Sequence, residues 1–520
     1  MKILNLTFIL IFSLGVIASA RVQTPSGEIA LSLRVRDPKT GQLVTTPLKI
    51  DPHKVGFVIV DPWNYHWCMT WTEQAGGMSP RMNRVLQGCR KLGMTVLWAP
   101  TDTASTFAGW PQRQRAMAMP YLPVPNVRKL DCHWTLPYGG CLCGPGLSCL
   151  VNYGEDGMDS RLEITESDLI VSGTQELYSI CQARGISVLI YGGGAINICL
   201  TGKDVGLGPM YAAGLQTIVA RDLSFAWTEY DPAKGYTPTT GNAQAAADLE
   251  RSQIATVMMG EELGKLGLWD DRWITEPVRI TPAGTLKRPY LFEKPVAVWL
   301  DAPNLEGAEI HYTLDGSEAA AFSPKFAGPI RLAETSTLRA AAFRLGRKVS
   351  LDGSGRFVRL PAVPPKPDVP LEGLQLVPDL YSASWLWQPK KDASYDGQPL
   401  RIRGTRYAKG YGTRAPAYLR FDLKPEWTRF VALAGVDDNM LNHDLGLEIA
   451  GFPLVVFKVF LDGKLAAESP ATRISQAPWR FNVPIPPGSR QIVLVSDDAG
   501  ARGPYNLGNW VEAGFVTKNE

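Results

Sequence analysis

The chain has 520 residues, well beyond the usual length of a single domain, so it is predicted to contain several domains. Hydrophobic residues make up 45% and charged residues 20% of the sequence, a globular composition that excludes disorder throughout. The 53 Lys and Arg against 50 Asp and Glu give a net charge of +3, too balanced for the concentrated basic field that nucleic-acid binding needs. Nucleic acid is therefore not an expected partner.

Residues 1–20 predict a secretory signal peptide. Lys2 gives the basic start, Ile3 to Ile17 form the apolar run, and the small residues that end at Ala20 predict cleavage near that position. A membrane anchor is the alternative, but polar residues interrupt the run and it is short for a membrane span. We find no later segment that could cross a membrane, so we expect a secreted or periplasmic protein.

Three blocks follow the signal peptide. Residues 22–278 alternate strand-like and helical runs, which predicts an α/β domain of three layers with a parallel sheet between helices. Residues 279–362 and 371–520 contain short strands separated by turns, which predicts two all-β sandwich domains. The Pro-rich residues 363–370 predict a semi-rigid linker. The clearest elements of the first block are strands at Val55–Val60 and Thr95–Trp98, a helix at Thr174–Arg184, and strands at Ser187–Tyr191 and Thr217–Ala220.

Residues suited to chemistry follow two of these strands. Asp61 comes directly after the first strand, at the carboxyl end where open α/β sheets hold their ligands. The strand that ends at Tyr191 runs into a Gly-rich turn that leads to Cys199, where a nearby helix N-terminus would favour a thiolate. Cys199 is therefore the leading candidate nucleophile. The turn supplies four candidate oxyanion or substrate-loop residues, Ala195, Ile196, Asn197 and Ile198.

Residues 50–265 resemble the isochorismatase-like cysteine hydrolases. The resemblance is carried by Asp61, the segment Gly173 to Gly185, the turn that ends at Cys199, and the strand end Ala220-Arg221-Asp222. Members of that family use an Asp, a Lys and a Cys. The resemblance implies that Asp61 activates Cys199, which attacks an amide-type or related bond of a small molecule.

The family's Lys is not identified by its expected spacing. Residues 161–165, where we look for it, read Arg-Leu-Glu-Ile-Thr. Arg161 is expected to replace the positive charge, although a guanidinium cannot exchange the proton, and Lys129 is a second possible source. The sequence therefore leaves three alternatives for this domain: an active thiol hydrolase, an enzyme with a changed chemistry, or a catalytically silent relative of the family.

The sequence signals for a metal site and for disulfides are weaker than those for the catalytic residues. Asp61 with His66 makes a poor metal site, and His53 and His133 are unspecific, so no metal and no cofactor are assigned. All eight cysteines lie at or before Cys199. Four of them fall in a Gly- and Pro-rich loop, namely Cys132, Cys141, Cys143 and Cys149. In an exported chain these four favour disulfides over zinc, with three possible pairings.

The two β-rich blocks also resemble known modules. Residues 279–362 carry the string Tyr312 to Ser317 and resemble the small sandwich at the C-terminal side of chitobiases and hexosaminidases, which implies a rigid spacer. Residues 371–520 resemble the NPCBM type of carbohydrate-binding module, on the strings Gly404 to Thr413 and Phe430 to Asp438. This second resemblance implies glycan binding.

Candidate sugar-contacting residues come from segments that read as loops. Aromatic faces stack on sugar rings while amides and charged groups bind hydroxyls. These considerations select Tyr411, Arg414, Asn509 and Trp510. Asp437 and Asp438 could ligate calcium, but two adjacent acids more often form a solvated turn.

Together these observations favour an exported hydrolase with a cysteine nucleophile, tethered to a polysaccharide or other glycan by its C-terminal module. Its expected partners are a small-molecule substrate and the glycan. The alternative is a non-catalytic glycan-binding or cell-surface protein that keeps a degenerate hydrolase fold as a scaffold. The unidentified Lys is the main support for that alternative.

Overall fold

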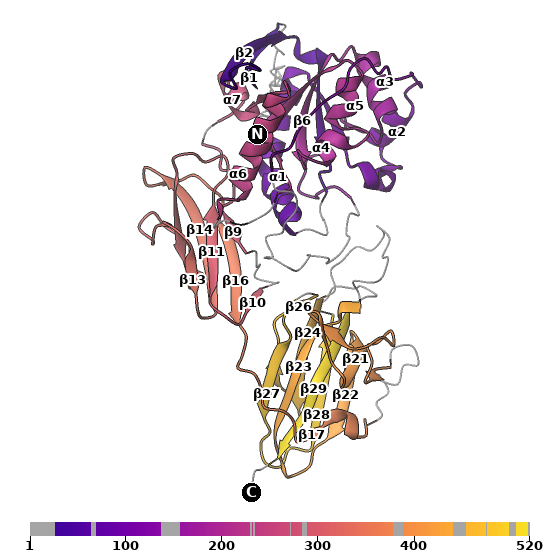
Figure 1. Cartoon of the computed structure of the whole chain (residues 1–520), viewed down its shortest axis with the longest axis vertical. Helices are drawn as coiled ribbons and strands as arrows, with labels where there is room; N and C mark the ends of the chain where they lie inside the picture. Colours follow the sequence, from indigo (N-terminus) through magenta and orange to yellow (C-terminus); the bar gives the residue numbers. More distant parts are fainter. Residues whose placement is uncertain are drawn as a thin grey trace, which may run out of the picture.

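The computed structural model consists of three sheet-containing units that follow one another along the chain (Figure 1). An α/β unit lies at one end, a small β-sandwich in the middle and a larger β-sandwich at the other end. The structure describes residues 27–63, 69–136, 157–228, 231, 234–270, 272–282, 289–377, 388–439, 454–474, 476–498 and 506–517. The predicted signal peptide lies outside these residues. Within these ranges, no helix combines the length and the apolar character needed to cross a membrane.

The α/β unit is built on an eight-stranded sheet with the order β2-β1-β8-β7-β6-β3-β4-β5. The strands are β1 Ile29–Arg36, β2 Leu43–Ile50, β3 Val55–Val60, β4 Thr95–Ala99, β5 Leu169–Ile170, β6 Val188–Gly194, β7 Gln216–Phe225 and β8 Ala255–Val257. From β8 to β5 all neighbours are parallel, whereas β1 is antiparallel to both β2 and β8. The expected parallel sheet is therefore a mixed sheet, because an antiparallel hairpin extends one edge.

Helices cover both faces of this sheet. They are α1 Met69–Leu92, α2 Pro111–Met117, α3 Thr174–Arg184, α4 Cys199–Gly202, α5 Leu207–Ala212, α6 Pro238–Arg251 and α7 Met259–Lys265. Alternate residues of β3 enter two separate cores, with Phe57 and Ile59 in the core under α1 and α7. Val58 and Val60 enter the core under α3, α5 and α6. A strand buried on both faces is what a central parallel strand requires, and it confirms the three-layer α/β prediction.

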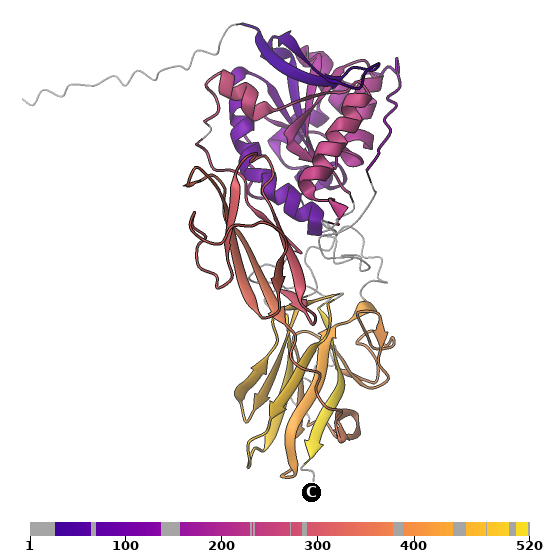
Figure 2. The same cartoon turned by 60° about the vertical axis from the view of Figure 1, so that its left-hand side comes forward.

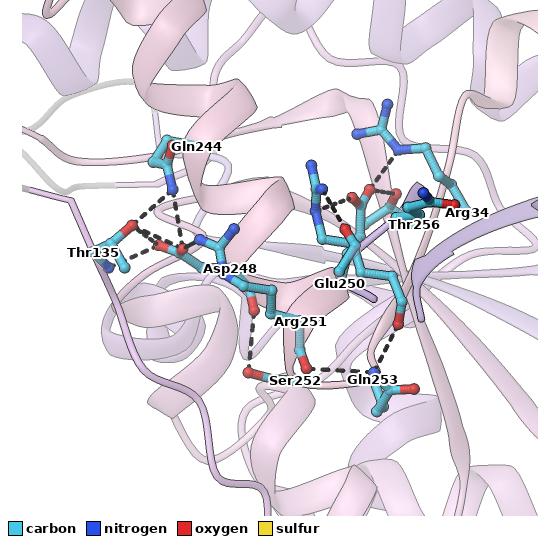
Figure 3. A network of polar contacts seen from close by, with 12 residues as sticks. Arg34, Thr135, Gln244, Asp248, Glu250, Arg251, Ser252, Gln253 and Thr256 are labelled. Carbon is cyan, nitrogen blue, oxygen red and sulfur yellow. Dashed lines mark hydrogen bonds and ion pairs between the residues drawn. The ribbon is translucent and has the colours of Figure 1, made fainter. Parts of the chain in front are cut away.

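Two buried carboxylates on α6 hold other parts of the α/β unit (Figure 3). Asp248 accepts hydrogen bonds from the backbone N–H and the hydroxyl of Thr135, both at 2.9 Å. Glu250 accepts from Arg34 Nε and from Thr256 Oγ1, both at 2.6 Å. Because burying a carboxylate without partners costs free energy, these contacts fix the segment before residue 137 and the strand β1 against the same helix.

The middle unit is a small sandwich of two sheets. Its strands are β9 Arg279–Thr281, β10 Tyr290–Phe292, β11 Val296–Asp301, β12 Glu309–Thr313, β13 Ile330–Leu332, β14 Ser336–Arg344, β15 Arg347–Lys348 and β16 Gly353–Arg359. One sheet has the order β10-β16-β14-β12 and the other β13-β11-β9. Val298, Leu338 and Phe357 are fully buried between them. β10 and β16 are parallel, so this sandwich is not wholly antiparallel.

The C-terminal unit is a larger sandwich. Its strands are β17 Val369–Pro370, β18 Lys390–Lys391, β19 Arg401–Ile402, β20 Thr405–Arg406, β21 Gly410–Arg414, β22 Ala417–Asp422, β23 Trp427–Val436, β24 Leu454–Leu461, β25 Lys464–Glu468, β26 Thr472–Arg473, β27 Trp479–Pro484, β28 Gln491–Asp497 and β29 Leu507–Thr517. The first sheet has the order β18-β21-β29-β23-β27, and the second β22-β28-β24-β25. Phe421, Phe457 and Phe515 are among the large side chains buried between the sheets.

A buried ion network joins the α/β unit to the chain that enters the middle sandwich. Arg81 on α1 contacts Asp222 at 2.9 Å and Glu276 at 3.0 Å, and its side chain is only 10% exposed. Asp222 also accepts the backbone N–H groups of Met259 and Gly260. Figure 2 shows α1, the long indigo-to-violet helix, running down toward the middle sandwich. This network ties the central sheet, α1, α7 and the start of the next unit together.

Candidate functional site

Asp61 lies where the sequence predicts it, directly after β3 at the carboxyl end of the sheet. Its side chain is fully buried, and its backbone N–H donates to the carbonyl of Ala99 at 3.0 Å. Its φ of 47° is uncommon for a residue with a side chain, and Thr101 nearby has a φ of 36°. Backbone strain of this kind concentrates at functional sites, where the surrounding structure holds it in place.

Lys203 is the cation that pairs with Asp61. Its Nζ lies 3.2 Å from Asp61 Oδ2 and 2.5 Å from Asp102 Oδ2, and it donates to Thr101 Oγ1 at 2.8 Å. The ammonium group also lies 4.4 Å from the ring centroid of Trp63. Lys203 was missed because we looked for the Lys upstream of α3. Its signal was its position four residues after Cys199, a spacing that places two side chains on one helix face.

Arg161 does not pair with Asp61 in the described part of the chain. Its side chain is 61% exposed and forms an ion pair with Asp159 of the same segment. Lys129, the other source considered, is exposed. The positive charge that we assigned to Arg161 is therefore supplied by Lys203, because α4 is short enough to bring its C-terminal end back to the sheet.

Cys199 begins α4 and is half-buried beside Asp61. The Cys199 thiol and the Asp61 carboxyl group lie close enough for each to influence the pKa of the other. Burial and the Asp61 charge together raise the pKa of Cys199 to about 12, against the opposing effect of Lys203. This raised pKa argues against a resting thiolate, because α4 has a single turn and the Asp61 charge beside the thiol is negative.

Burial also moves the pKa of Asp61. Loss of water around the carboxyl group raises its pKa to about 6, while the Lys203 charge lowers it. At neutral pH the carboxylate is thus ionised next to a protonated thiol. This is the arrangement of a general base whose pKa lies near the operating pH.

The Gly-rich turn before Cys199 brings β6 against β3. Gly193 has a φ of 96°, and a Cβ atom there would lie 2.0 Å from the carbonyl oxygen of Val60, so no other residue fits. Among the four predicted loop residues, Ile196 donates its N–H to Phe225 and Ile198 to Ala195. Those two amides are therefore already paired with backbone carbonyls, one at the end of β7 and one in the turn itself. The Asn197 side chain exchanges hydrogen bonds of 2.8 and 2.9 Å with the backbone of Trp227.

A pocket opens beside Asp61 on the α1 side of the sheet. Apolar side chains form most of its wall, and Ser79 and Asp159 add polar groups joined by a hydrogen bond of 3.3 Å. The lining residues are Asp61, Pro62, Trp63, Ala75, Met78, Ser79, Met82, Asp159, Leu162, Gly193 and Phe225.

The other cysteine and histidine predictions are tested only in part. His66, Cys141, Cys143 and Cys149 lie outside the described residues. Within the described ranges, Cys89, Cys132, Cys181 and Cys199 are free thiols, so a disulfide at Cys132 is not confirmed. The same ranges contain no group of three His, Cys, Asp or Glu residues arranged to hold a metal ion.

All four predicted sugar-contacting residues lie in strands rather than loops. Tyr411 is in β21, and Asn509 and Trp510 are in β29. Trp510 is fully buried and packs edge-on against Phe457, with ring centroids 5.2 Å apart. A buried indole cannot stack on a sugar, so Trp510 belongs to the core. Arg414 is half-buried at the end of β21.

Asp437 and Asp438 do not form the solvated turn that we favoured, because both are buried. Asp437 accepts a hydrogen bond of 2.5 Å from Asn509 Nδ2, and burial raises its pKa to about 7. Asp438 accepts from the backbone N–H groups of Arg403 and Gly404, at 2.9 and 2.5 Å. The pair therefore anchors the β19–β20 hairpin to the end of β23.

Two family models match the β-rich part of the chain. Residues 291–352 match the chitobiase/beta-hexosaminidase C-terminal domain, and residues 372–516 match the NPCBM/NEW2 domain. The C-terminal sandwich is similar to a carbohydrate-binding module. Both matches agree with the resemblances that the sequence motifs carry, and the NPCBM-type module covers almost the whole C-terminal unit.

Individual relatives were also found. A curated protein of Renibacterium salmoninarum, whose name describes an endo-alpha-N-acetylgalactosaminidase, is 28% identical over 126 residues, 24% of this chain and 8% of that protein. The chain thus spans a small part of that relative. A solved CBM51 module from a Clostridium perfringens GH95 protein, in complex with methyl-galactose, is 24% identical, with 28% of this chain and 99% of that chain covered at a TM-score of 0.25. A cysteine hydrolase from Pseudomonas syringae pv. phaseolicola 1448A is 13% identical, with coverages of 45% and 97% and a TM-score of 0.27.

Proposed function

We propose that the protein is an exported, glycan-bound hydrolase whose α/β unit cleaves an amide-type bond of a small molecule through Cys199. The observation that supports this most is the proximity of three groups: Lys203 Nζ lies 3.2 Å from the buried Asp61 carboxylate, and the Cys199 thiol is near enough to that carboxylate for its charge to raise the thiol pKa. A nucleophile, a base and a cation are the parts that covalent acyl transfer needs. Glycan binding belongs to the NPCBM-type module.

The proposed reaction starts from the protonated thiol. As Cys199 Sγ bonds to the substrate carbonyl carbon, its proton passes to Asp61, and Lys203 balances the negative charge of the site. Asp61 then returns the proton to the leaving amine, which departs and leaves a thioester on Cys199. Water cleaves the thioester to a carboxylic acid and restores the thiol. Asn197 and Cys199 supply the backbone amides that we assign to the developing oxyanion, because Ile196 and Ile198 donate elsewhere.

Loss of the thiol tests the nucleophile. Cys199→Ser is expected to reduce ammonia release from a panel of small carboxamides to background, because a hydroxyl is a far weaker nucleophile in this setting. Cys132→Ser is the matched control, since Cys132 is also a half-buried free thiol of the same unit. It should keep full activity. Equal activity of Cys199→Ser and the parent protein would exclude the proposed nucleophile.

The pH dependence tests the base. Asp61 must be ionised to accept the thiol proton, so activity should rise with pH through about 6, the pKa to which burial raises this group. Lys203 lowers the Asp61 pKa. Lys203→Met should therefore move the acid limb of the rate profile to higher pH by about one unit or more. A limb that stays in place after this change would show that another group controls the rate.

The second candidate is a glycan-binding protein without catalysis, and one observation favours it. Both family-model matches lie in the β-rich units. This candidate predicts that the protein binds polysaccharide and that no carboxamide of the panel is turned over. The first candidate predicts binding and turnover together.

A further inference from the structure

We infer that the C-terminal module selects anionic glycans, carrying carboxylate or sulfate groups, through a basic surface formed by residues 390–414. This inference rests on the proposed glycan binding and specifies its chemistry. The stretch lies between β18 and the end of β21 and contains the β19–β20 hairpin. We call it the basic insertion.

The charge of the basic insertion is concentrated. Its seven basic residues are Lys390, Lys391, Arg401, Arg403, Arg406, Lys409 and Arg414, and its two acidic residues are Asp392 and Asp396. All of the basic residues except Arg414 are exposed. The rest of the chain brings the net charge back to only +3. A local excess of this kind attracts anions even when the whole molecule is nearly neutral.

Most of this charge is not neutralised internally. Asp392 pairs with Lys409 at 2.9 Å. In the described part of the chain, five of the cations form no ion pair: Lys390, Lys391, Arg401, Arg403 and Arg406. Arg403 lies near enough to Glu293 to lower the pKa of that carboxyl, but Glu293 is already paired with Arg480 at 2.6 Å.

The hairpin that carries three of the arginines is held rigidly. Ile402 is buried against Leu400 and Val511 on the outer face of the first sheet. The buried Asp438 binds the backbone N–H groups of the turn, at Arg403 and Gly404. Asn509 also donates to the carbonyl of Arg401 at 3.3 Å. A surface that is already ordered loses less entropy when a ligand binds.

An aromatic ring lies beside the same cations. The Tyr395 ring is within 5.9 Å of both Lys390 Nζ and the Arg414 guanidinium. Sugar rings stack on aromatic faces, while guanidinium and ammonium groups bind carboxylate or sulfate oxygens with charge-assisted hydrogen bonds. A ring flanked by two cations therefore fits an acidic sugar better than a neutral one. This combination also distinguishes a sugar site from a surface that is merely basic.

The test measures binding of the full chain to matched pairs of polysaccharides. Polygalacturonate is compared with its methyl ester, and dextran sulfate with dextran, so each pair differs only in charged groups. We expect at least about tenfold tighter binding to one or both anionic members, with an affinity that falls as salt rises. The pair that responds identifies carboxylate or sulfate as the recognised group. Equal binding to charged and uncharged members would overturn the inference but leave glycan binding intact, whereas no binding to any polysaccharide would remove the proposed glycan function.

Variants locate the site. The triple change Lys390→Gln, Arg401→Gln and Arg406→Gln should weaken binding of the anionic polysaccharide by about tenfold or more. The control changes Lys424→Gln, Lys464→Gln and Arg490→Gln remove the same charge from exposed residues in or next to strands of the second sheet and should have less than about a twofold effect. Thermal unfolding checks that both triples fold.

A third variant separates a sugar site from a general polyanion site. Tyr395→Leu keeps every charge but removes the aromatic face, so it should weaken polysaccharide binding and leave any binding of double-stranded DNA unchanged. Equal losses in both triple variants would contradict the location of the site. If DNA bound as tightly as polysaccharide and Tyr395→Leu had no effect, the surface would be a general polyanion site, and the inference that its ligand is a glycan would be wrong.

Discussion

Asp61→Asn is expected to abolish amide hydrolysis while making Cys199 more reactive toward an alkylating reagent. The two effects have opposite signs because Asp61 has two roles. As a base it accepts the thiol proton, and its loss should cost about 10²–10⁴-fold in rate. As a negative charge it raises the pKa of Cys199, so the neutral amide should lower that pKa and increase the thiolate fraction at neutral pH.

Alkylation is measured by mass spectrometry of the Cys199 peptide after timed exposure to iodoacetamide at several pH values. Cys132 provides the internal control, because burial raises its pKa and the charged groups that act on it are Asp248, Asp131 and Arg251 rather than Asp61. Its labelling rate should not change. If Cys199 labelling were unchanged or slower in Asp61→Asn, the carboxylate would not be acting on the thiol, and the proposed pairing would be wrong.

Arg81→Met is expected to destabilise the α/β unit by about 3–5 kcal/mol. Removing one partner of a buried ion pair leaves the remaining charge without compensation. Here two carboxylates, Asp222 and Glu276, lose their shared partner. Asp222 keeps its hydrogen bonds from the backbone of Met259 and Gly260. Most of the lost stability therefore comes from Glu276, whose buried carboxylate no longer has its arginine partner. The free energy of unfolding is measured by denaturant titration.

Arg272→Met is the matched control for Arg81→Met. Arg272 forms an ion pair with Asp270 at 2.6 Å, but its side chain is 75% exposed. Water replaces the lost partner at such a site, so little change in stability is expected. If both variants lost a comparable amount of unfolding free energy, the buried ion network would contribute no more to stability than an exposed ion pair does.

The main elements of the α/β unit could be predicted because their sequence signals are local. The run Val55–Val60 is apolar throughout, and the strand there spans those residues. The helix predicted at Thr174–Arg184 also has those bounds, because Gly185 takes a φ of 65° and ends it. The β1–β2 hairpin was not foreseen, since most of β2 is exposed and has no continuous apolar run to mark it.

The candidate site could be predicted only in part, because contacts between distant residues leave little trace in sequence. Asp61 and Cys199 each follow a recognisable strand, whereas the partner of Asp61 depends on how the short α4 turns back toward the sheet. Arg161 occupied the expected position but has its own acid, Asp159. Trp510 read as a loop residue because Asn and Gly precede it, yet cross-strand packing buries it.

The cysteine nucleophile is tested by the mass of the Cys199 peptide from protein quenched during turnover of a hydrolysed carboxamide. We expect the peptide to gain the acyl group of the substrate, and we expect no such gain in Cys199→Ser. Turnover with no acyl group on Cys199, and with the Cys199→Ser variant still active, would contradict a cysteine nucleophile at this site.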